Sequence, residues 1–277
     1  MIVLATSAGD PAITASDGLY ADALRRRGHE VVGAPWDGPR AAFDGADAVV
    51  IRSTWGYYRA PEAFRDWTEA MASATRLFNP VGLVRWNLRK DYVDKLSAAG
   101  IRVPLTRIVT REAAAIERVF AETGWTVAVV KPATGASGHA VELVARDAVG
   151  DALPRLAGDA VLVQEFLPEI AEGEVSLVYF DGAFSHAIRK RPPAGEFRVN
   201  SRFGATRAAE TPAPQVIAQG AAALRPLPEL PLYARVDGVV RGDTLIVIEI
   251  EVLEPALFLD FAPAAAERFA EATLRRL

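Results

Sequence analysis

The sequence predicts an α/β plus α+β protein, in which a small parallel domain precedes two α+β subdomains. Two observations carry this prediction. Short apolar runs alternate with helical patterns over about the first 80 residues, which is typical of βαβ units. Further along, turns at Asp181-Gly182 and Arg241-Gly242-Asp243 separate apolar runs and indicate antiparallel hairpins. We expect domains at residues 1–85, 86–167 and 168–277.

In the parallel domain, apolar runs bounded by polar or glycine-containing loops predict three buried strands. These are Ile2 to Ala5, Glu30 to Ala34 and Ala48 to Arg52. A helix is expected from Asp17 to Arg27, with Gly28 at its C′ position. A second helix is expected from Pro61 to Thr75, with proline in its first turn.

In the central subdomain we expect a helix from Asn87 to Ala99, ended by Gly100, and another from Arg111 to Thr123. Its strands are expected at Thr126 to Lys131, Val141 to Val144 and Val161 to Phe166. The last subdomain should contain strands at Val175 to Phe180, Phe184 to Arg189, Leu232 to Val240 and Thr244 to Ile250. One helix is expected within residues 207–231, and an amphipathic helix from Pro263 to Leu277 should close the chain.

Composition excludes several classes of function. The net charge is -4, from 35 acidic and 31 basic residues, which gives no reason to expect a nucleic-acid partner. The absence of cysteine excludes disulfides, thiolate nucleophiles and zinc–thiolate sites. Because neither a signal peptide nor a membrane-spanning apolar run is visible, we expect a cytoplasmic protein without a membrane partner.

The chain has 27 arginines and only four lysines, Lys90, Lys95, Lys131 and Lys190. Each lysine could therefore lie where a compact ammonium is needed, although chance survival on the surface is the alternative.

Lys131 ends an apolar run, and Gly135, Ser137 and Gly138 follow it closely. Glycines let backbone N–H groups approach a polyphosphate, and a lysine supplies a compact positive charge. The order is not that of a Walker A loop, in which the lysine follows the glycines. A plain glycine-rich hairpin turn is the alternative.

Three carboxylates are expected on one face of the last hairpin. Asp237 should lie opposite Glu249, and Glu251 shares the face of Glu249 because strand side chains alternate. Such carboxylates repel one another unless a cation lies among them. Oxygen ligands suit Mg²⁺, which nucleotide phosphates and water would complete. A surface strand whose glutamates face water is the alternative.

Residues 188–204 form a basic segment that proline and glycine interrupt, so no helix is expected there. It contains Arg189, Lys190, Arg198 and Arg202. Fixed cations near a phosphate loop could stabilise a transferring phosphoryl group and an oxyanion. An exposed basic loop is the alternative.

Taken in order, these segments resemble the ATP-grasp superfamily over roughly Asn87 to Leu259. The pattern is most similar to bacterial glutathione synthetases, ribosomal-protein glutamate ligases and cycloserine-forming cyclo-ligases. The resemblance implies an ATP-grasp fold, with an N-terminal α/β domain, a lid-like central subdomain and ATP between the central and last subdomains. It also implies a ligase that uses ATP and Mg²⁺, or Mn²⁺ in its place, to activate a carboxylate as an acyl phosphate for attack by a nitrogen nucleophile.

The resemblance implies nucleotide contacts residue by residue. Lys90 and Lys131 resemble the two nucleotide lysines, and Gly135 to Gly138 resembles the loop that closes over the phosphates. Glu174 resembles the ribose-binding acid, with Glu172 as a competitor. The hinge strand that holds adenine is represented by Gln164, Glu165 and Leu167, the last two through main-chain groups.

Catalytic and metal roles are implied in the same way. Arg198 and Asn200 resemble an Arg-x-Asn element that contacts the reacting phosphoryl group and the metal or substrate. Glu249 and Glu251 resemble a Glu-x-Asn element in which glutamate replaces asparagine, which leaves one or two metal ions open. Asp237 resembles the remaining ligand. The catalytic set is Arg198, Arg235 and Lys190.

The N-terminal domain should help to choose a small amino-acid-like substrate, because loops after the strands of open α/β sheets bind ligands. Arg52 could pair with a substrate carboxylate and Trp55 could form a wall, with Arg189 and Arg202 as further contacts. Ordinary loop packing is the alternative. Residues 52–58 and 253–259 look most like the cycloserine-type cyclo-ligases, in which the nucleophile belongs to the same molecule.

Other functions stay open at this point. These are a peptide or glutamate ligase that extends an acceptor, an ATP-grasp kinase, and a nucleotide-binding module without turnover. A homodimer is common in this group. The histidines, His29, His139 and His186, are expected to be structural because the chemistry needs no side-chain nucleophile.

Overall fold

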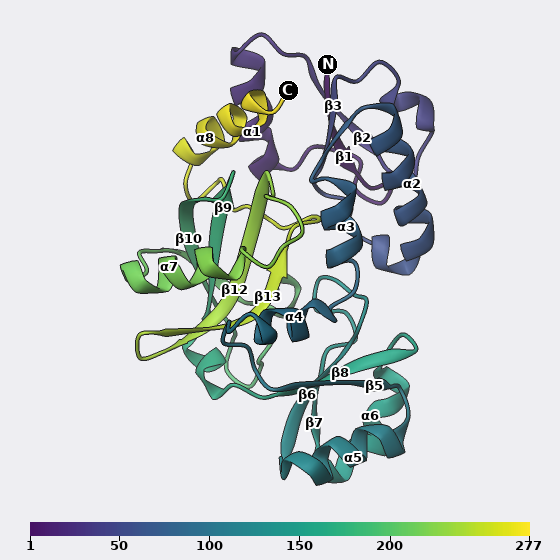
Figure 1. Cartoon of the computed structure of the whole chain (residues 1–277), viewed down its shortest axis with the longest axis vertical. Coiled ribbons are helices and arrows are strands. Elements are labelled where there is room, and N and C mark those ends of the chain that lie inside the picture. The colour runs from purple at the N-terminus through teal and green to yellow at the C-terminus, as the bar shows by residue number, and fades with distance from the viewer.

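The computed structural model describes all 277 residues and arranges them around three sheets (Figure 1). A parallel sheet lies at the end of the molecule where both chain termini are found. A five-stranded antiparallel sheet occupies the middle, and a four-stranded antiparallel sheet forms the opposite end. The mixed α/β and α+β architecture predicted from the sequence is confirmed.

The N-terminal sheet is parallel throughout, in the order β2-β1-β3-β4. Its elements are β1 (Ile2–Thr6), α1 (Ala15–Arg26), β2 (Val31–Pro35), β3 (Ala48–Ile51), α2 (Pro61–Ala74) and β4 (Arg76–Phe78). Thr14 caps α1, because its side chain accepts a hydrogen bond from the Asp17 N–H. The three-residue strand β4 was not predicted, since so short a run carries no periodicity.

Two short helices replace the single helix predicted from Asn87 to Ala99: α3 (Val81–Asn87) and α4 (Tyr92–Ala98). The break occurs because the Asn87 amide pairs with the main chain of another segment. Its nitrogen donates to the Ile250 carbonyl at 2.8 Å, and its oxygen accepts from the Val252 N–H at 3.0 Å. The Lys90 N–H, just beyond the break, donates to the Ala133 carbonyl at 2.8 Å.

The four-stranded sheet, here called the lid sheet, is antiparallel in the order β5-β8-β6-β7. Its elements are β5 (Thr106–Thr110), α5 (Ala113–Thr123), β6 (Val127–Pro132), β7 (Glu142–Ala145), α6 (Val149–Ala152) and β8 (Ala160–Glu165). The two helices pack on the sheet and give it a core of its own, which includes Ile116, Phe120, Val130 and Val163.

The five-stranded sheet has the order β11-β10-β9-β12-β13. Its elements are β9 (Glu174–Phe180), β10 (Ala183–Arg191), β11 (Thr206–Glu210), α7 (Pro214–Ala223), β12 (Tyr233–Arg241) and β13 (Thr244–Glu251). The edge strand β11 was not predicted. Asp237 pairs with Glu249 in the β12–β13 register, as the sequence predicted.

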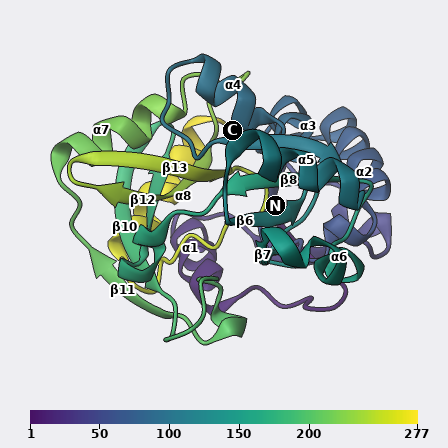
Figure 2. The same cartoon turned by 90° about the horizontal axis from the view of Figure 1, so that it is seen from below.

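The two faces of β9 have different partners because its side chains alternate. Leu177 and Tyr179 pack in a core with α7, whereas Val178 and Phe180 pack in a core with α8 (Ala264–Arg275). Figure 2, a view from below, shows α7 and α8 on different sides of β12. Glu174 and Ser176, at the start of the strand, share the α8 face of β9.

The C-terminal helix α8 joins the N-terminal sheet to the five-stranded sheet. Its Phe269 is fully buried and stacks on Tyr20 of α1, with ring centroids 3.9 Å apart, and on Phe180 of β9, at 4.7 Å. Side chains of β1, β3, β9 and α8 therefore belong to one hydrophobic core. The N-terminal sheet is fixed against the rest of the chain by this core.

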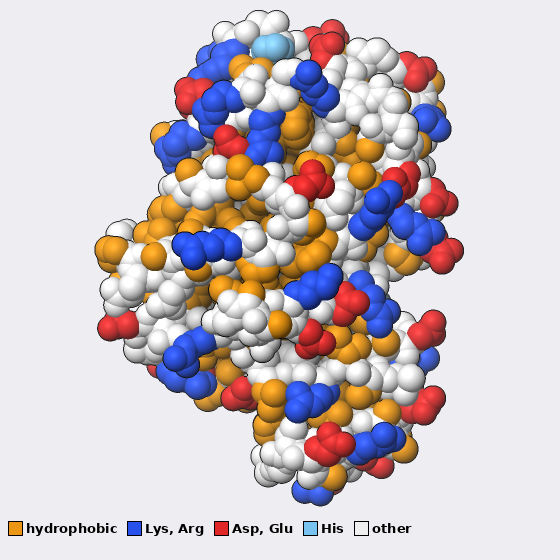
Figure 3. Space-filling view, viewed as in Figure 1, with side chains coloured by type: hydrophobic (Ala, Val, Ile, Leu, Met, Phe, Trp, Pro, Cys, Tyr) orange, Lys and Arg blue, Asp and Glu red, His pale blue; other side chains and the backbone are white.

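Acidic and basic side chains are interspersed over the face shown in Figure 3, and apolar side chains gather over its middle. No helix combines the length and the hydropathy that crossing a bilayer requires.

We predict that Phe269→Ala destabilises the whole protein, because it removes the ring shared by α1, α8 and β9. A loss of about 3–5 kcal/mol in the free energy of unfolding is expected in urea unfolding. Leu230→Ala is the control, since Leu230 is 56% exposed and its loss should change that free energy by less than about 0.5 kcal/mol. Equal effects of the two substitutions would contradict the shared core.

Candidate active site

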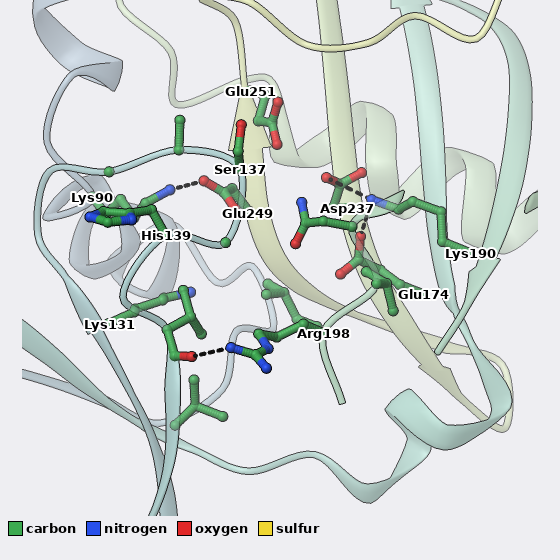
Figure 4. Close-up of a pocket in the computed structure, with 18 of the residues that line it drawn as sticks. Lys90, Lys131, Ser137, His139, Glu174, Lys190, Arg198, Asp237, Glu249 and Glu251 are labelled. Carbon is green, nitrogen blue, oxygen red and sulfur yellow. Dashed lines mark hydrogen bonds and ion pairs between the residues drawn. The ribbon is translucent and has the colours of Figure 1, made fainter. Parts of the chain in front are cut away.

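A cavity of about 420 Å³ lies where the three sheets meet. Its walls include all but two of the site residues that the sequence predicted, the exceptions being Arg52 and Arg189. The predicted residues that line the cavity are Trp55, Lys90, Lys131, Gly135, Ser137, Gly138, Gln164, Glu165, Leu167, Glu174, Lys190, Arg198, Asn200, Arg202, Arg235, Asp237, Glu249 and Glu251. Figure 4 shows Lys90, Lys131 and Ser137 on one side of this space, with Glu174, Lys190 and Asp237 across from them.

Strand alternation aims one row of charged side chains into the cavity. In the antiparallel register, Asp237 of β12 lies opposite Ser176 of β9, and Lys190 of β10 lies opposite Glu174. The Ser176 hydroxyl donates to Asp237 at 2.6 Å. The same face of β9 that is apolar near α8 is therefore polar where it reaches the cavity.

Arg235 lies between two of the predicted metal ligands. Its guanidinium donates to both carboxylate oxygens of Asp237, at 2.8 and 2.9 Å, and also to Glu251. Lys190 approaches Glu174 at 2.5 Å and Asp237 at 3.5 Å. Burial raises the pKa of Asp237, but Arg235 and Lys190 outweigh it and hold that pKa well below its usual range.

The third carboxylate, Glu249, is paired with Lys90. Each predicted metal ligand thus has a cationic side chain as its partner, and no three His, Cys, Asp or Glu side chains are grouped closely enough to hold a metal ion. We expected a divalent cation nested among Asp237, Glu249 and Glu251. In the structure, Lys90, Lys190 and Arg235 compensate the negative charges of these carboxylates.

Lys131 is buried on the lid-sheet side of the cavity, with 7% of its surface exposed. Burial lowers the pKa of its ammonium to about 7, and the neighbouring charge of Lys90 adds to the effect. Burial also lowers the pKa of Lys90. Two desolvated lysines side by side form a site that an anion would stabilise.

Glu196 orients Arg198, a function that the sequence did not reveal. The Arg198 guanidinium donates to both Glu196 oxygens, at 3.0 and 2.7 Å, and lies over the Phe203 ring at 3.8 Å from its centroid. Hydrogen bonds from Arg198 lower the pKa of Glu196 to about 2. The signal in the sequence that could have revealed this pair is that Glu196 and Arg198 are two positions apart in a segment without regular structure.

The glycine loop after β6 reaches across the cavity to both other parts of the chain. A Cβ at Gly138, whose φ is +67°, would meet the Asn200 side-chain oxygen at 2.5 Å. The next residue, His139, stacks on Tyr58 of the N-terminal part, with ring centroids 5.2 Å apart. Glycine at 138 is therefore required by both conformation and space, and His139 has the structural contact expected for it.

The strand end of β8 carries the residues predicted to contact adenine. The Gln164 side chain is buried and donates to the Thr106 hydroxyl at 2.9 Å, so it is committed to the lid sheet. Leu167 follows the strand, and its N–H donates to no backbone acceptor. A main-chain donor thus remains at this edge of the cavity.

Two predicted substrate contacts lie outside this cavity. Arg189 pairs with Glu210 at 2.8 Å on the opposite face of β10 from Lys190, because neighbouring strand residues alternate. We therefore remove Arg189 from the substrate contacts. Arg52 is buried, is paired with Asp17 at 2.9 Å and donates to the Pro255 carbonyl at 2.8 Å.

Arg52 lines a second cavity, of about 260 Å³, that shares walls with the first. Trp55, Arg207, Glu254 and Phe258 line both cavities. One guanidinium nitrogen of Arg52, Nη1, is buried without a hydrogen-bond partner. Glu254 lies within residues 253–259, which resemble the cyclo-ligases, but the sequence predicted no role for it.

The cavity lies between the lid sheet and the five-stranded sheet. Lysines of the lid sheet and of the α3–α4 junction face acids of the five-stranded sheet, and this arrangement defines an ATP-grasp ligase. The comparisons with known proteins agree. Residues 94–227 match the family described as prokaryotic glutathione synthetase, ATP-grasp domain, and residues 2–79 match D-cycloserine synthetase DcsG, N-terminal domain.

The chain is 34% identical over 261 residues to the cycloserine biosynthesis protein DcsG of Streptomyces lavendulae, covering 87% of each chain. It superposes on the crystal structure of D-cycloserine synthetase DcsG with a TM-score of 0.89, 30% identity and coverage of 99% of both chains. A RimK domain ATP-grasp protein of Sphaerobacter thermophilus shares the fold, with a TM-score of 0.73, 22% identity and coverage of 98% and 99% of the two chains. The chain belongs to the ATP-grasp ligases, which use ATP and a divalent metal to form C–N bonds.

Because the pKa of Lys131 is lowered to about 7, its side chain is mostly a neutral amine at pH 8. We therefore predict that ATP binding at that pH takes up a proton. If phosphate charge raises the pKa of Lys131 from about 7 to well above 8, uptake should approach about one proton, and affinity should fall as the pH rises above 7. Calorimetric titration in buffers of different ionisation enthalpy measures this uptake. Lys131→Met should abolish it, whereas Lys95→Met, at an exposed lysine, should leave it unchanged. Equal uptake by both variants would rule out Lys131 as its source.

Proposed function

We propose that the protein closes a cycloserine-type ring. ATP would phosphorylate the carboxylate of a small amino-acid-like substrate, and a nitrogen of the same molecule would then displace phosphate. One C–O bond to phosphate breaks and one C–N bond forms, with ADP, inorganic phosphate and a cyclic amide as products.

One observation carries this proposal: the N-terminal part supplies walls to both cavities. Trp55 and Tyr57 line the first, and Ser16, Asp17 and Arg52 line the second. This part matches the N-terminal domain of D-cycloserine synthetase, whereas the glutathione synthetase match covers only residues 94–227. A second cavity of about 260 Å³ is of small-molecule size, which favours ring closure over extension of a peptide.

For ATP, we propose that Lys90 and Lys131 hold the phosphates beneath the loop from Gly135 to Gly138. The main-chain groups of Glu165 and Leu167 would hold adenine. Glu174 would accept hydrogen bonds from the ribose, with Lys190 balancing its charge. The support is their shared cavity and the unpaired Leu167 N–H.

These carboxylates would also hold a divalent metal, for which we propose Mg²⁺, with Mn²⁺ as a substitute, once they are released from the cationic side chains that pair with them and come closer together. Asp237 and Glu249 are directly opposite in register, and all three acids offer oxygen donors to one cavity. When bound, the metal would neutralise charge on the phosphates. Lys90 could then exchange its Glu249 contact for a phosphate oxygen, which frees that carboxylate as a ligand.

Two arginines suit the acyl-transfer step. Arg198 is fixed by Glu196, and Arg235 is fixed by Asp237 and the Ala256 carbonyl. Preorganised guanidinium groups of this kind stabilise the charge of an acyl phosphate and of a tetrahedral oxyanion. Asn200, beside Gly138, would keep the closed loop in place over the phosphates.

Glu249→Ala should lower the rate of ADP release by about 100-fold or more, because a metal ligand and the partner of Lys90 are lost together. The assay measures ADP at increasing Mg²⁺ concentration. Glu117→Ala, an exposed glutamate on α5, is the control and should remain at the wild-type rate. Unchanged turnover of Glu249→Ala would remove this residue from the metal site.

Ring closure itself predicts a defined stoichiometry. We would screen amino acids, dipeptides and aminooxy or ureido amino acids, with and without added amine, and measure ADP, inorganic phosphate and product mass. With an aminooxy amino acid alone, ADP and phosphate should form in equal amounts, and the product should weigh one water less than the substrate. A need for added amine would indicate intermolecular ligation, and a stable phosphorylated product would indicate a kinase.

A further inference from the structure

One buried carboxyl group at the junction of the two cavities has no partner. Glu254 follows β13, is 8% exposed and lines both cavities. It makes no hydrogen bond or ion pair with any other residue of the chain. The neighbouring acids differ from it, because Glu249 pairs with Lys90 and Glu251 pairs with Arg235.

The cations nearest to Glu254 are already engaged elsewhere. Arg52 is paired with Asp17 and the Pro255 carbonyl, and Arg235 is paired with Asp237 and Glu251. Burial, followed by the charge of Glu251, raises the pKa of Glu254 to about 8. An unpaired buried carboxylate is costly, and a cation delivered by a ligand would remove that cost.

We propose that Glu254 binds the α-ammonium group of the substrate and makes the enzyme specific for α-amino acids; this inference rests on the ring-closing function proposed above. The charge argument selects which nitrogen it binds. A nitrogen that attacks an acyl phosphate must carry a free electron pair, so it is neutral. The α-ammonium is the cation of the molecule and complements the buried carboxylate.

The position of Glu254 also fits the order of groups in an α-amino acid. Ammonium and carboxylate are attached to the same carbon, so an ammonium held at the junction keeps the carboxylate within a few ångströms of it. Arg235, which lines the first cavity, is on the side where that carboxylate would meet the phosphoryl group. The rest of the substrate would lie in the second cavity, between Trp55 and Phe258.

The test combines two substrates with two enzymes. O-Aminoserine carries the α-ammonium, and 3-(aminooxy)propanoic acid is the same molecule without it. Wild-type enzyme should favour O-aminoserine by about 100-fold in kcat/KM, since a charge-assisted pair is lost with the analogue. In Glu254→Gln this preference should fall to within about threefold, through a higher KM for O-aminoserine at nearly unchanged kcat.

Asp260→Asn is the matched control, because Asp260 is an exposed carboxylate that lines only the second cavity. It should keep the wild-type preference. A lost preference in this variant would assign the effect to the general charge of the cavity and overturn the role of Glu254. An unchanged preference in Glu254→Gln would overturn it as well.

Stability provides an independent readout. At pH 9, above the pKa of about 8, Glu254→Gln should melt at or above the wild-type temperature, since a neutral amide is easier to bury than an unpaired carboxylate. Glu254→Asp covers the case of a misfolded Gln variant and should show an intermediate preference. Failure of wild-type enzyme to release ADP with either molecule would contradict the proposed ring closure itself, which is a different result from equal use of both.

Discussion

The structure of the active site depends on the compensation of buried charge across the five-stranded sheet. Arg235 holds Asp237 and Glu251 together, and Lys190 bridges Glu174 and Asp237 from the neighbouring strand. Removing one member of such a network would leave an uncompensated charge in a poorly solvated place, which is far costlier than losing a surface ion pair. The network therefore fixes the positions of these side chains in the wall of the cavity. Arginine and lysine groups supply the positive charge that allows these acids to share one cavity.

The distribution of hydrophobic cores determines how this site can open. The N-terminal sheet and the five-stranded sheet share one core through α8, so they form a single body. The lid sheet has a separate core, and it meets α4 through a cluster of only three buried residues, Val93, Ala133 and Leu162. Little apolar surface joins the lid sheet to the rest of the chain. Movement of the lid sheet would therefore require less free energy than separation of the other two sheets. The loop from Gly135 to Gly138 lies against Asn200 at Gly138, and His139 after it stacks on Tyr58, so the loop covers the cavity from the lid side. Substrate entry would have to break these contacts first.

Much of this architecture was predictable because it follows from local rules. Apolar runs and glycine turns gave most strands, and the turn at Gly242 gave the register that places Asp237 opposite Glu249. The errors arose where tertiary contacts decide. Asn87 ends a helix because β13 offers main-chain partners, which no helical pattern contains. Arg189 and Lys190 were both placed at the site, although adjacent strand residues face opposite ways. The pairing of Arg235 with Asp237 and Glu251 was missed because a sequence gives the positions of charges along strands but not which charges will meet.

That pairing gives a physical reason for the glutamate at position 251, where the ATP-grasp pattern has asparagine. An additional carboxylate beside Asp237 and Glu249 would be unfavourable by itself. Here the guanidinium of Arg235 donates to Asp237 and Glu251 at once, so the pair of residues 235 and 251 adds no net charge relative to two neutral side chains. Residue 251 keeps an oxygen directed at the cavity, while its charge serves to hold Arg235. The substitution at 251 and the arginine at 235 are thus one feature of the site rather than two. Glu254, three residues further along, receives no such compensation from the chain, and burial raises its pKa to about 8. In the complex proposed above, the α-ammonium of the substrate would supply the missing positive charge.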